Sequence, residues 1–274
     1  MDQWTEVEMM VTVKAYPQLS KKSGEVVCVA GVRTDLEKPE WIRIYPVPFR
    51  DLPLSDRFEK YDIVKLRVAK STDTRRESYK PDLASLRVVE KISTGADRKW
   101  SRRTQILGSL RADQSMCAIL KAQDGPRVDA PSLALIQPRE IVEVGVVPND
   151  QFSAEKKRLA EMASAVDLFG NSKSTLEPAP YQVKYRYLCS DKSCKSHDQS
   201  LIDWELGAAG RKWSTQYTPS EISERIRKKF YGQLCAGDRD THFYIGNQHQ
   251  RPKGFLILGV YWPPIDSSGQ DSLF

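Results

Sequence analysis

The chain has 274 residues, of which 40% are hydrophobic, and it carries a formal net charge of +6 at pH 7. This length favours two modules or one elaborate module. No stretch approaches the roughly 18–20 uninterrupted apolar residues of a membrane helix, and the N-terminus lacks the basic end and apolar run of a secretory signal. We therefore expect a cytoplasmic protein with reduced thiols and no membrane partner.

The basic charge balance is compatible with a polyanionic partner. The isoelectric point is about 9.0, and lysine and arginine side chains supply the sequence-independent part of nucleic-acid affinity by neutralising phosphates. Charge alone does not identify a ligand, because 28% of the residues are charged and most of them solvate the surface. Nucleic acid, either DNA or RNA, is thus one candidate partner.

The first 90 residues are rich in predicted strands. Residues 7–16, 25–32, 41–47 and 61–70 combine apolar runs or clean alternation with Pro and Gly turns between them. The run 25–32 shows little alternation, as expected of a strand that is buried on both faces. Short strands at this spacing predict a small barrel or sandwich.

A basic segment interrupts the strand pattern between residues 98 and 111. It contains five basic residues and no acidic one, and it predicts a helix that continues through residues 115–121. Residues 132–136 and 140–147 return to strand patterning. Residues 1–150 are therefore predicted to be a β-rich module with a basic helical insertion.

The segment 151–180 is predicted to be a helix followed by a linker. Residues 154–169 are strong helix formers, and Ser153 precedes them as an N-cap. The polar stretch that follows runs into Pro178-Ala179-Pro180, which marks a boundary between two parts of the chain.

Residues 181–265 are predicted to form a mixed module. An alternating aromatic and basic strand spans residues 181–188, a helix spans 219–231, and a closing strand pair spans 242–247 and 254–262. Residues 266–274 are predicted to be a tail. The predicted fold class is α+β, with a β-rich, barrel-like N-terminal module and a mixed α+β C-terminal module. No internal repeat is visible.

The densest cluster of ligand-type side chains is Cys189-x4-Cys194-x2-His197, in a stretch rich in turn formers. Zinc favours thiolate and imidazole ligands in a tetrahedral shell, so this spacing predicts a Zn²⁺ knuckle. The alternative is a surface loop that happens to carry two cysteines. Cys28 and Cys117 lie in apolar runs and are interpreted as small core residues. A closed site needs a fourth ligand, for which the candidates are Cys235, His242, His249, Asp191 and Asp198.

Asp203 and Glu205 flank Trp204 shortly after this cluster. Together with His197 around a divalent metal, they are candidate catalytic residues of a hydrolase or nuclease. Carboxylates at i and i+2 point to opposite sides of a strand, and about 200° apart on a helix, so a single chelate from both is awkward. In the alternative interpretation Trp204 is a core anchor and Glu205 pairs with a nearby arginine.

Basic residues alternate with aromatic ones around Trp41, within the segment 98–111 and along residues 184–187. Aromatic faces stack unpaired bases while Arg and Lys follow phosphates, so these sets predict contacts with nucleic acid. The alternative is ordinary strands with one buried and one solvated face. The predicted contacts are Trp41, Arg43, Tyr45, Arg98, Lys99, Arg102, Arg103, Lys184 and Arg186, with Tyr185 and Tyr187 as further stacking residues.

Two blocks of the chain resemble a family of uncharacterised bacterial proteins. The first is residues 41–50 (WIRIYPVPFR), and the second is the C-x4-C-x2-H cluster followed by Asp-Trp-Glu at 203–205. The resemblance covers most of the chain and implies a bacterial cytoplasmic protein of this layout. It implies no activity and supplies no catalytic residues.

Three functions are open from the sequence. The first is a nucleic-acid-binding protein with a structural zinc site, in which metal binding contributes to folding. The second is a metal-dependent hydrolase or nuclease that uses His197, Asp203 and Glu205. The third is a non-enzymatic sensor or partner-binding module with an interface at the Pro-rich residues 46–53. Phosphate-binding loops, dinucleotide fingerprints and nucleophile elbows are missing, so we expect a binding protein rather than an enzyme.

Overall fold

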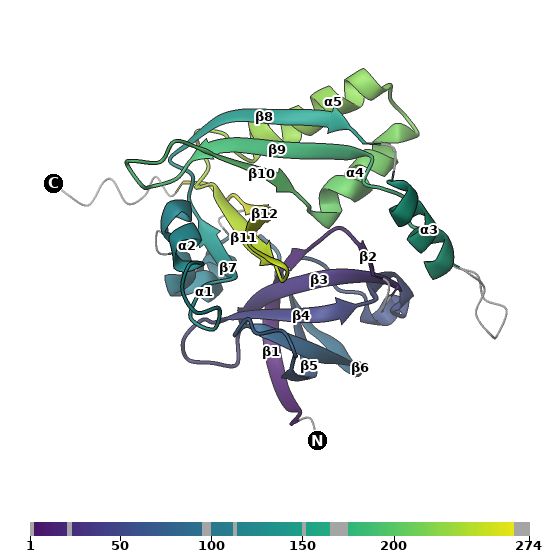
Figure 1. The fold of residues 1–274 in the computed structure, drawn as a ribbon, viewed down its shortest axis with the longest axis vertical. Coiled ribbons are helices and arrows are strands. Elements are labelled where there is room, and N and C mark those ends of the chain that lie inside the picture. The colour runs from purple at the N-terminus through teal and green to yellow at the C-terminus, as the bar shows by residue number, and fades with distance from the viewer. Residues whose placement is uncertain are drawn as a thin grey trace.

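The computed structural model describes residues 3–20, 24–94, 100–111, 114–149, 152–164 and 175–265, which fold into two strand-rich halves. Figure 1 shows the first half (purple to blue) below the second (teal to yellow). Strands β1–β6 form one six-stranded sheet and strands β7–β12 form another. No helix among these residues has the length and hydropathy needed to cross a bilayer.

The first sheet closes into a barrel. Its strands follow the order β1-β5-β6-β4-β3-β2, and β1 also pairs with β3, so that five of them form a ring. Neighbouring strands are antiparallel except for β4 and β6, which are parallel. The strands are β1 (Thr5–Lys14), β2 (Gln18–Ser20), β3 (Gly24–Arg33), β4 (Trp41–Val47), β5 (Asp62–Lys70) and β6 (Ser78–Lys91).

The strand order of this ring identifies its fold. Numbered along the chain without the short edge strand β2, it is 1-2-3-5-4-1, with the third and fifth strands parallel. This is the order of the oligonucleotide/oligosaccharide-binding (OB) barrel, a Greek key whose second and third strands carry the ligand face. Alternate side chains fill the interior, where Val7 and Met9 of β1 lie opposite Leu66 and Val64 of β5.

Gly31 permits β3 to close against β1. It lies opposite Val11 in the β1–β3 pairing. A Cβ atom at this position would lie 2.2 Å from the carbonyl oxygen of Met10 and 2.5 Å from the side chain of Met9. Because real Cβ atoms do not approach backbone oxygens this closely, only glycine allows the two strands to meet without displacing β1.

The second sheet repeats the same order. β7 (Leu133–Ile136) pairs with β11, β8 (Glu140–Pro148) pairs with β9, and only residues 137–139 separate them. Taken as one interrupted strand, β7 and β8 complete a ring of order 1-2-3-5-4-1 in which β10 and β12 are the parallel third and fifth strands. The other strands are β9 (Tyr181–Leu188), β10 (His197–Leu201), β11 (His242–Gln248) and β12 (Arg251–Tyr261).

The helices connect and cover the two barrels. α1 (Ser101–Leu107) and α2 (Met116–Ala122) lie in the connection between the barrels. α3 (Ala154–Ala163) follows β8 and packs against β2 and β3 of the first barrel. α4 (Trp204–Ser214) and α5 (Pro219–Arg227) lie between the third and fourth strands of the second barrel. A capping box between Thr218 and Glu221 starts α5, and a π-helical segment, Lys228–Gln233, continues it.

The two barrels meet through a shared apolar core. Met10, Ala30 and Val32 on the outer face of β1 and β3 pack in one buried cluster with Tyr244 and Leu258 of β11 and β12. Side chains of β7 and Trp100 complete this cluster. The second barrel thus covers this part of the outer surface of the first barrel.

Arg43 of β4 joins the barrels at the edge of this core. Its side chain is only 3% exposed. The guanidinium donates hydrogen bonds to the carbonyl oxygens of Ser132, at 2.9 Å, and Asn247, at 3.3 Å. The carboxylate of Glu77 accepts from the backbone N–H and the hydroxyl of Ser132, so both buried charges have partners. Arg43 is therefore an interface residue without a surface from which it could contact a phosphate.

The fold-class prediction is confirmed, since the protein is α+β with a closed barrel. β7 and β8, which lie within the expected first module of residues 1–150, pair with strands of the second sheet. The helix expected across residues 98–121 is two short helices separated by a 3-10 turn (Gly108–Arg111). Strands β6 and β10 were not predicted. The expected tail, residues 266–274, lies outside the described part of the chain.

Replacement of Arg43 tests this interface. Arg43→Met keeps the apolar stem but removes the hydrogen bonds to the carbonyl oxygens of Ser132 and Asn247, so we expect the free energy of unfolding to fall by about 1–3 kcal/mol. Arg67→Met is the matched control, because Arg67 of β5 pairs with Asp82 at the surface and should contribute less than about 1 kcal/mol. Urea denaturation measures both, and equal midpoints for the two variants would contradict the assignment.

Candidate functional site

Four ligand-type side chains converge at one end of the second barrel. Cys189 directly follows β9, Cys194 lies in the loop before β10, His197 is the first residue of β10, and Cys117 lies in the first turn of α2. Their ligand atoms all lie within 4.8 Å of one another. The Cys117 Sγ is 3.7 Å from the Cys189 Sγ and 3.5 Å from the His197 Nε2. This Cys3His group could hold a metal ion.

A tight turn brings Cys194 back to Cys189. The Asp191 carboxylate accepts hydrogen bonds from the backbone N–H of Ser193, at 2.7 Å, and from its hydroxyl, at 2.6 Å. The backbone N–H of Cys194 then donates to the carbonyl oxygen of Asp191. Asp191 is thus occupied in shaping the loop, as Asx turns do, rather than in contributing a ligand.

Hydrogen bonds among the Cys3His side chains influence which of them carry a proton. Burial, together with the neighbouring Cys189 thiol, raises the pKa of Cys117 to about 12. Burial also disfavours a Cys189 thiolate, but hydrogen bonds with the backbone of Cys117 and Asp191 outweigh this and lower its pKa. Burial lowers the pKa of His197, which keeps the imidazole neutral and able to bind a metal. A bound dication would allow several thiolates to coexist here.

Cys117, interpreted from the sequence as a core residue, packs against the core of the second barrel and also contacts Cys189 and His197. Of the residues proposed as fourth ligand, Cys235 donates to the carbonyl oxygen of Phe230, and His242 contacts the carbonyl oxygen of Asp240. His249 pairs with Asp73 of the first barrel, and Asp198 pairs with Arg186. Cys117 precedes Cys189 by 72 positions and lies inside an apolar helix. The one sequence signal that could have indicated it as a ligand is that a tetrahedral site needs a fourth ligand besides Cys189, Cys194 and His197.

Asp203 and Glu205 do not share a site with His197. From His197 to Asp203 the chain is extended, which separates the two residues by roughly 20 Å. The Asp203 carboxylate caps α4 by accepting from the backbone N–H of Glu205, and it pairs with Lys60 at 2.8 Å. Burial opposes the charge on Lys60, but the carboxylates of Asp203 and Glu205 outweigh it and raise the pKa of Lys60. Trp204 packs on Phe49 of the first barrel. The hydrolase constellation predicted from the sequence is therefore not assembled.

Lys184 and Arg186 lie on the outer face of β9, together with Gln182. The alternation of this strand turns Tyr185 and Tyr187 into the barrel core, where they are fully buried and cannot stack a base. Lys184 and Arg186 are about half exposed and pair with Asp198 at 3.8 and 3.3 Å. Arg186 also pairs with Glu143 of β8. In an OB barrel this face, formed by the second and third strands, is the ligand face.

The other predicted contacts are scattered. Arg102 is exposed and pairs with Glu90. The Arg103 guanidinium donates to the carbonyl oxygen of Ile92 and stacks on Tyr61, 3.9 Å from the ring centroid. Trp41 packs edge-on against Tyr244, whereas Tyr45 is exposed. Arg98 and Lys99 lie outside the described residues. The predicted contacts in this group that the structure describes lie on β4 and α1 rather than on β9.

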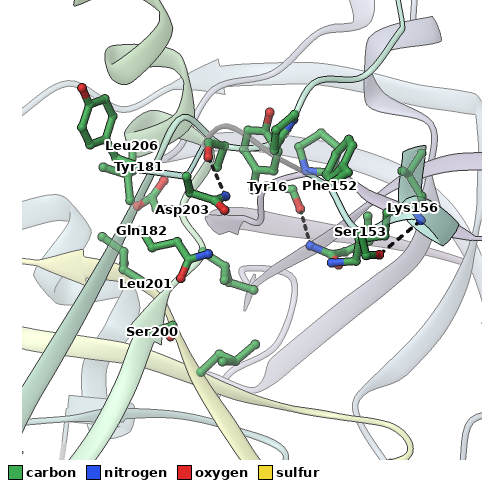
Figure 2. Close-up of a pocket in the computed structure, with 18 of the residues that line it drawn as sticks. Tyr16, Phe152, Ser153, Lys156, Tyr181, Gln182, Ser200, Leu201, Asp203 and Leu206 are labelled. Atoms are coloured by element: carbon green, nitrogen blue, oxygen red, sulfur yellow. Dashed lines mark hydrogen bonds between the residues drawn. The ribbon is translucent and has the colours of Figure 1, made fainter. Parts of the chain in front are cut away.

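A cavity of about 410 Å³ lies between the barrels, and sequence reasoning did not anticipate it. Figure 2 shows Gln182, Ser200 and Leu201 of the second barrel on one side of it, with Ser153 and Lys156 at the start of α3 on the other. Tyr16, which follows β1, joins the barrels here by donating its backbone N–H to the carbonyl oxygen of Ile202. The cavity therefore opens beside the β9 face, with Gln182 belonging to both.

Two family models match this chain. A family model described as Domain of unknown function (DUF8757) matches residues 112–274, and one described as Domain of unknown function (DUF8758) matches residues 5–109. The two matches meet in the connection between the barrels. A search of curated proteins finds no match.

Several solved structures are similar over most of this chain. The p204 HINb domain has 8% identity, covers 96% of this chain and 98% of its own, and has a TM-score of 0.32. A murine DNA binding protein bound with ds DNA has 8% identity, covers 96% and 100%, and has a TM-score of 0.28. A replication protein A heterotrimer bound to ssDNA has 10% identity, covers 98% and 67%, and has a TM-score of 0.28. At such TM-scores nothing about function is transferred.

Two substitutions separate the structural and catalytic interpretations of the acidic pair. Asp203→Ala removes the cap of α4 and leaves Lys60 buried without its main partner, so we expect a loss of about 3–5 kcal/mol in unfolding free energy. Glu205 is 54% exposed and lies 3.9 Å from Lys60, so Glu205→Ala should cost less than about 1 kcal/mol. Thermal and urea unfolding measure both. Metal-dependent nuclease activity that Glu205→Ala abolishes in a folded protein would restore the hydrolase hypothesis.

Proposed function

The chain belongs to the family described as Domain of unknown function (DUF8757), and we propose that it is a nucleic-acid-binding protein with a structural zinc ion. The observation that carries this proposal is the exposed ligand face of its second OB-type barrel, which presents Lys184 and Arg186 on β9. Because one fold hosts many functions, the charges on the face, rather than the barrel itself, support the ligand class.

The hairpin formed by β9 and β10 carries a local excess of positive charge. Residues 181–201 contain four basic residues and two acidic ones, and the basic residues Lys184, Arg186, Lys192 and Lys195 are all exposed. Surface ion pairs such as those between Arg186 and the nearby carboxylates contribute little, because solvent screens them. A phosphate, which accepts two parallel hydrogen bonds from arginine, can compete with such partners.

Two distances within the Cys3His group match those of a zinc site, and all four ligand atoms lie within 4.8 Å of one another. Zinc–sulfur bonds of about 2.3 Å and zinc–nitrogen bonds of about 2.0–2.1 Å in a tetrahedron place two sulfurs about 3.8 Å apart and sulfur and nitrogen about 3.6 Å apart. The distances from the Cys117 Sγ are 3.7 Å to the Cys189 Sγ and 3.5 Å to the His197 Nε2. Four protein ligands complete the shell, which favours a structural role over a catalytic one.

Zinc in this position would order the ligand face. Three of its ligands lie at the tip of the β9–β10 hairpin, and the fourth, Cys117, comes from the connection between the barrels. The metal would therefore hold the loop that carries Lys192 and Lys195 in one conformation. Since the ligands are far apart in sequence, the free energy of metal binding contributes to folding.

Loss of Cys117 should remove the zinc. We expect one zinc ion per chain in the wild type and, in Cys117→Ser, affinity reduced by more than about 100-fold, because loss of even an outer-shell partner costs 10–100-fold. Affinity should rise with pH, since the Cys117 thiol must release its proton to bind. Metal analysis and chelator competition measure both. Cys28→Ser and Cys235→Ser are the matched controls, and loss of zinc from either would contradict the ligand set.

Removal of the β9 charges should weaken nucleic-acid binding and its salt dependence together. For a single strand, Lys184→Ala/Arg186→Ala should lower the slope of log affinity against log salt by about 0.7 per lost phosphate contact. Fluorescence anisotropy with labelled single- and double-stranded DNA and RNA measures this.

The matched control for this measurement is Lys65→Ala/Arg87→Ala, which removes the same two charges from β5 and β6, where both residues pair with Glu6. Asp198→Asn should strengthen binding, because it frees both cations of β9 from their shared carboxylate. Absence of binding at low salt would refute the proposal and favour the partner-binding alternative.

A further inference from the structure

The cavity between the barrels is built from the loops that OB folds use for ligands. Residues 15–23, which include the short strand β2, connect the first two strands of the first ring, and residues 149–180 connect those of the second. Both connections line the cavity, through residues such as Gln18 and Asn149. In OB barrels this connection borders the ligand face. The volume of about 410 Å³ lies within the ~300–1,000 Å³ range of small-ligand sites.

The wall of the cavity is partly apolar, and its polar part is nearly neutral. Carboxamides and hydroxyls supply most of the polar groups, and the one buried carboxylate, Asp203, is held by Lys60 and by the N-terminus of α4. Lys156 lies at the side of the cavity and is exposed to solvent. An occupant with a full charge would find little compensation here, because burial of an unpaired ion is costly. The chemistry suits a flat, uncharged group with hydrogen-bonding edges. The carboxamides and hydroxyls are those of Gln18, Asn149, Gln182, Gln248, Ser153 and Ser200.

Of the aromatic side chains that line the cavity, Phe152 is the one that a flat, uncharged group could stack on. Tyr16 and Tyr181 also line the cavity, but they are 6% and 5% exposed and form its closed wall. The Tyr16 hydroxyl is already bonded to the Glu177 carbonyl oxygen. Phe152 is half-buried and lies two residues before the first residue of α3 (Figure 2). An unpaired base stacks well on a ring of this kind.

The cavity is continuous with the charged face of β9. Gln182 lines the cavity, and Lys184 and Arg186 are the next two residues on the same side of the strand. Same-side residues repeat every ~6.6 Å along a strand. A nucleic-acid strand with phosphates on Lys184 and Arg186 would therefore bring its next nucleotide to the mouth of the cavity.

We propose that the ligand is a single-stranded nucleic acid and that one of its bases, unstacked from its neighbours, occupies the cavity between the barrels against Phe152. This inference rests on the proposed function. A base that is paired within a duplex cannot enter the cavity without flipping out, which costs several kcal/mol and favours single strands. The carboxamides of Gln182 and Gln248 supply donor and acceptor pairs that match the edge of a base.

An abasic scan on the full-length, zinc-loaded protein tests this. Labelled DNA and RNA strands of about 12 nucleotides, each with one abasic position, are titrated by anisotropy beside the matching duplex. We expect the intact strand to bind at least about tenfold more tightly than the duplex, and one abasic position to weaken binding far more than the others. Phe152→Ala should weaken binding about fivefold or more, remove this positional effect, and leave the salt slope unchanged.

The controls separate this inference from the proposed function. Lys184→Ala/Arg186→Ala should lower the salt slope but keep the sensitive abasic position. Trp4→Ala, an exposed aromatic at the start of the chain, should change neither. Phe152→Leu keeps the apolar volume and should still lose the positional effect, and unfolding midpoints verify that both Phe152 variants fold.

Three outcomes would contradict the cavity inference, the proposed binding surface or both. If duplex and single strand bind equally, or no abasic position stands out while the β9 variant still lowers the slope, the proposed function holds and the cavity inference fails. If the β9 variant binds with the affinity and salt slope of the wild type, the β9 face is not the binding surface, and absence of binding at low salt refutes the proposed function itself. Oligosaccharide binding that Phe152→Ala weakens, without nucleic-acid affinity, overturns both.

Discussion

The contact between the two barrels fixes how they are oriented relative to one another. An apolar surface on β1 and β3 is buried by β11 and β12, and Arg43 joins the edge of this contact through two carbonyl oxygens of the second barrel. Because a buried charge is costly without hydrogen bonds, the two bonds of the guanidinium restrict the relative orientation of the barrels. Everything between the barrels, including the cavity and the pairing of Lys60 with Asp203, follows from this orientation.

The same contact decides which barrel can bind a ligand on its open face. In the first barrel the outer face of the second and third strands is covered where Ala30, Val32 and Arg43 meet the second barrel. In the second barrel the corresponding face carries exposed Lys184 and Arg186. Two barrels of one strand order thus have different roles, one as a platform and one as the proposed binding surface.

The connection between the barrels contributes one residue to the Cys3His group. α2 contributes Cys117 and buries Met116 and Ile119 in the core of the second barrel. A metal there would join the connection to the tip of the β9–β10 hairpin, at the far end of β9 from the cavity. The ligand face would then be held at both ends, by the metal and by the contact between the barrels.

The sequence by itself determined the α+β class, most of the strands and three of the four Cys3His residues, because alternation and close spacing are local properties. It did not indicate β6, where Pro81 interrupts the pattern, or β10, whose residues are mostly polar. The surroundings of Cys117, Arg43 and Asp203 could not be predicted from the sequence, for one physical reason. Their partners lie 72, 89 and 143 positions away in Cys189, Ser132 and Lys60, and only tertiary packing decides which distant groups share a buried site. The repeated barrel was hidden likewise, since strand order is set by long-range pairing and leaves no periodic trace in the sequence.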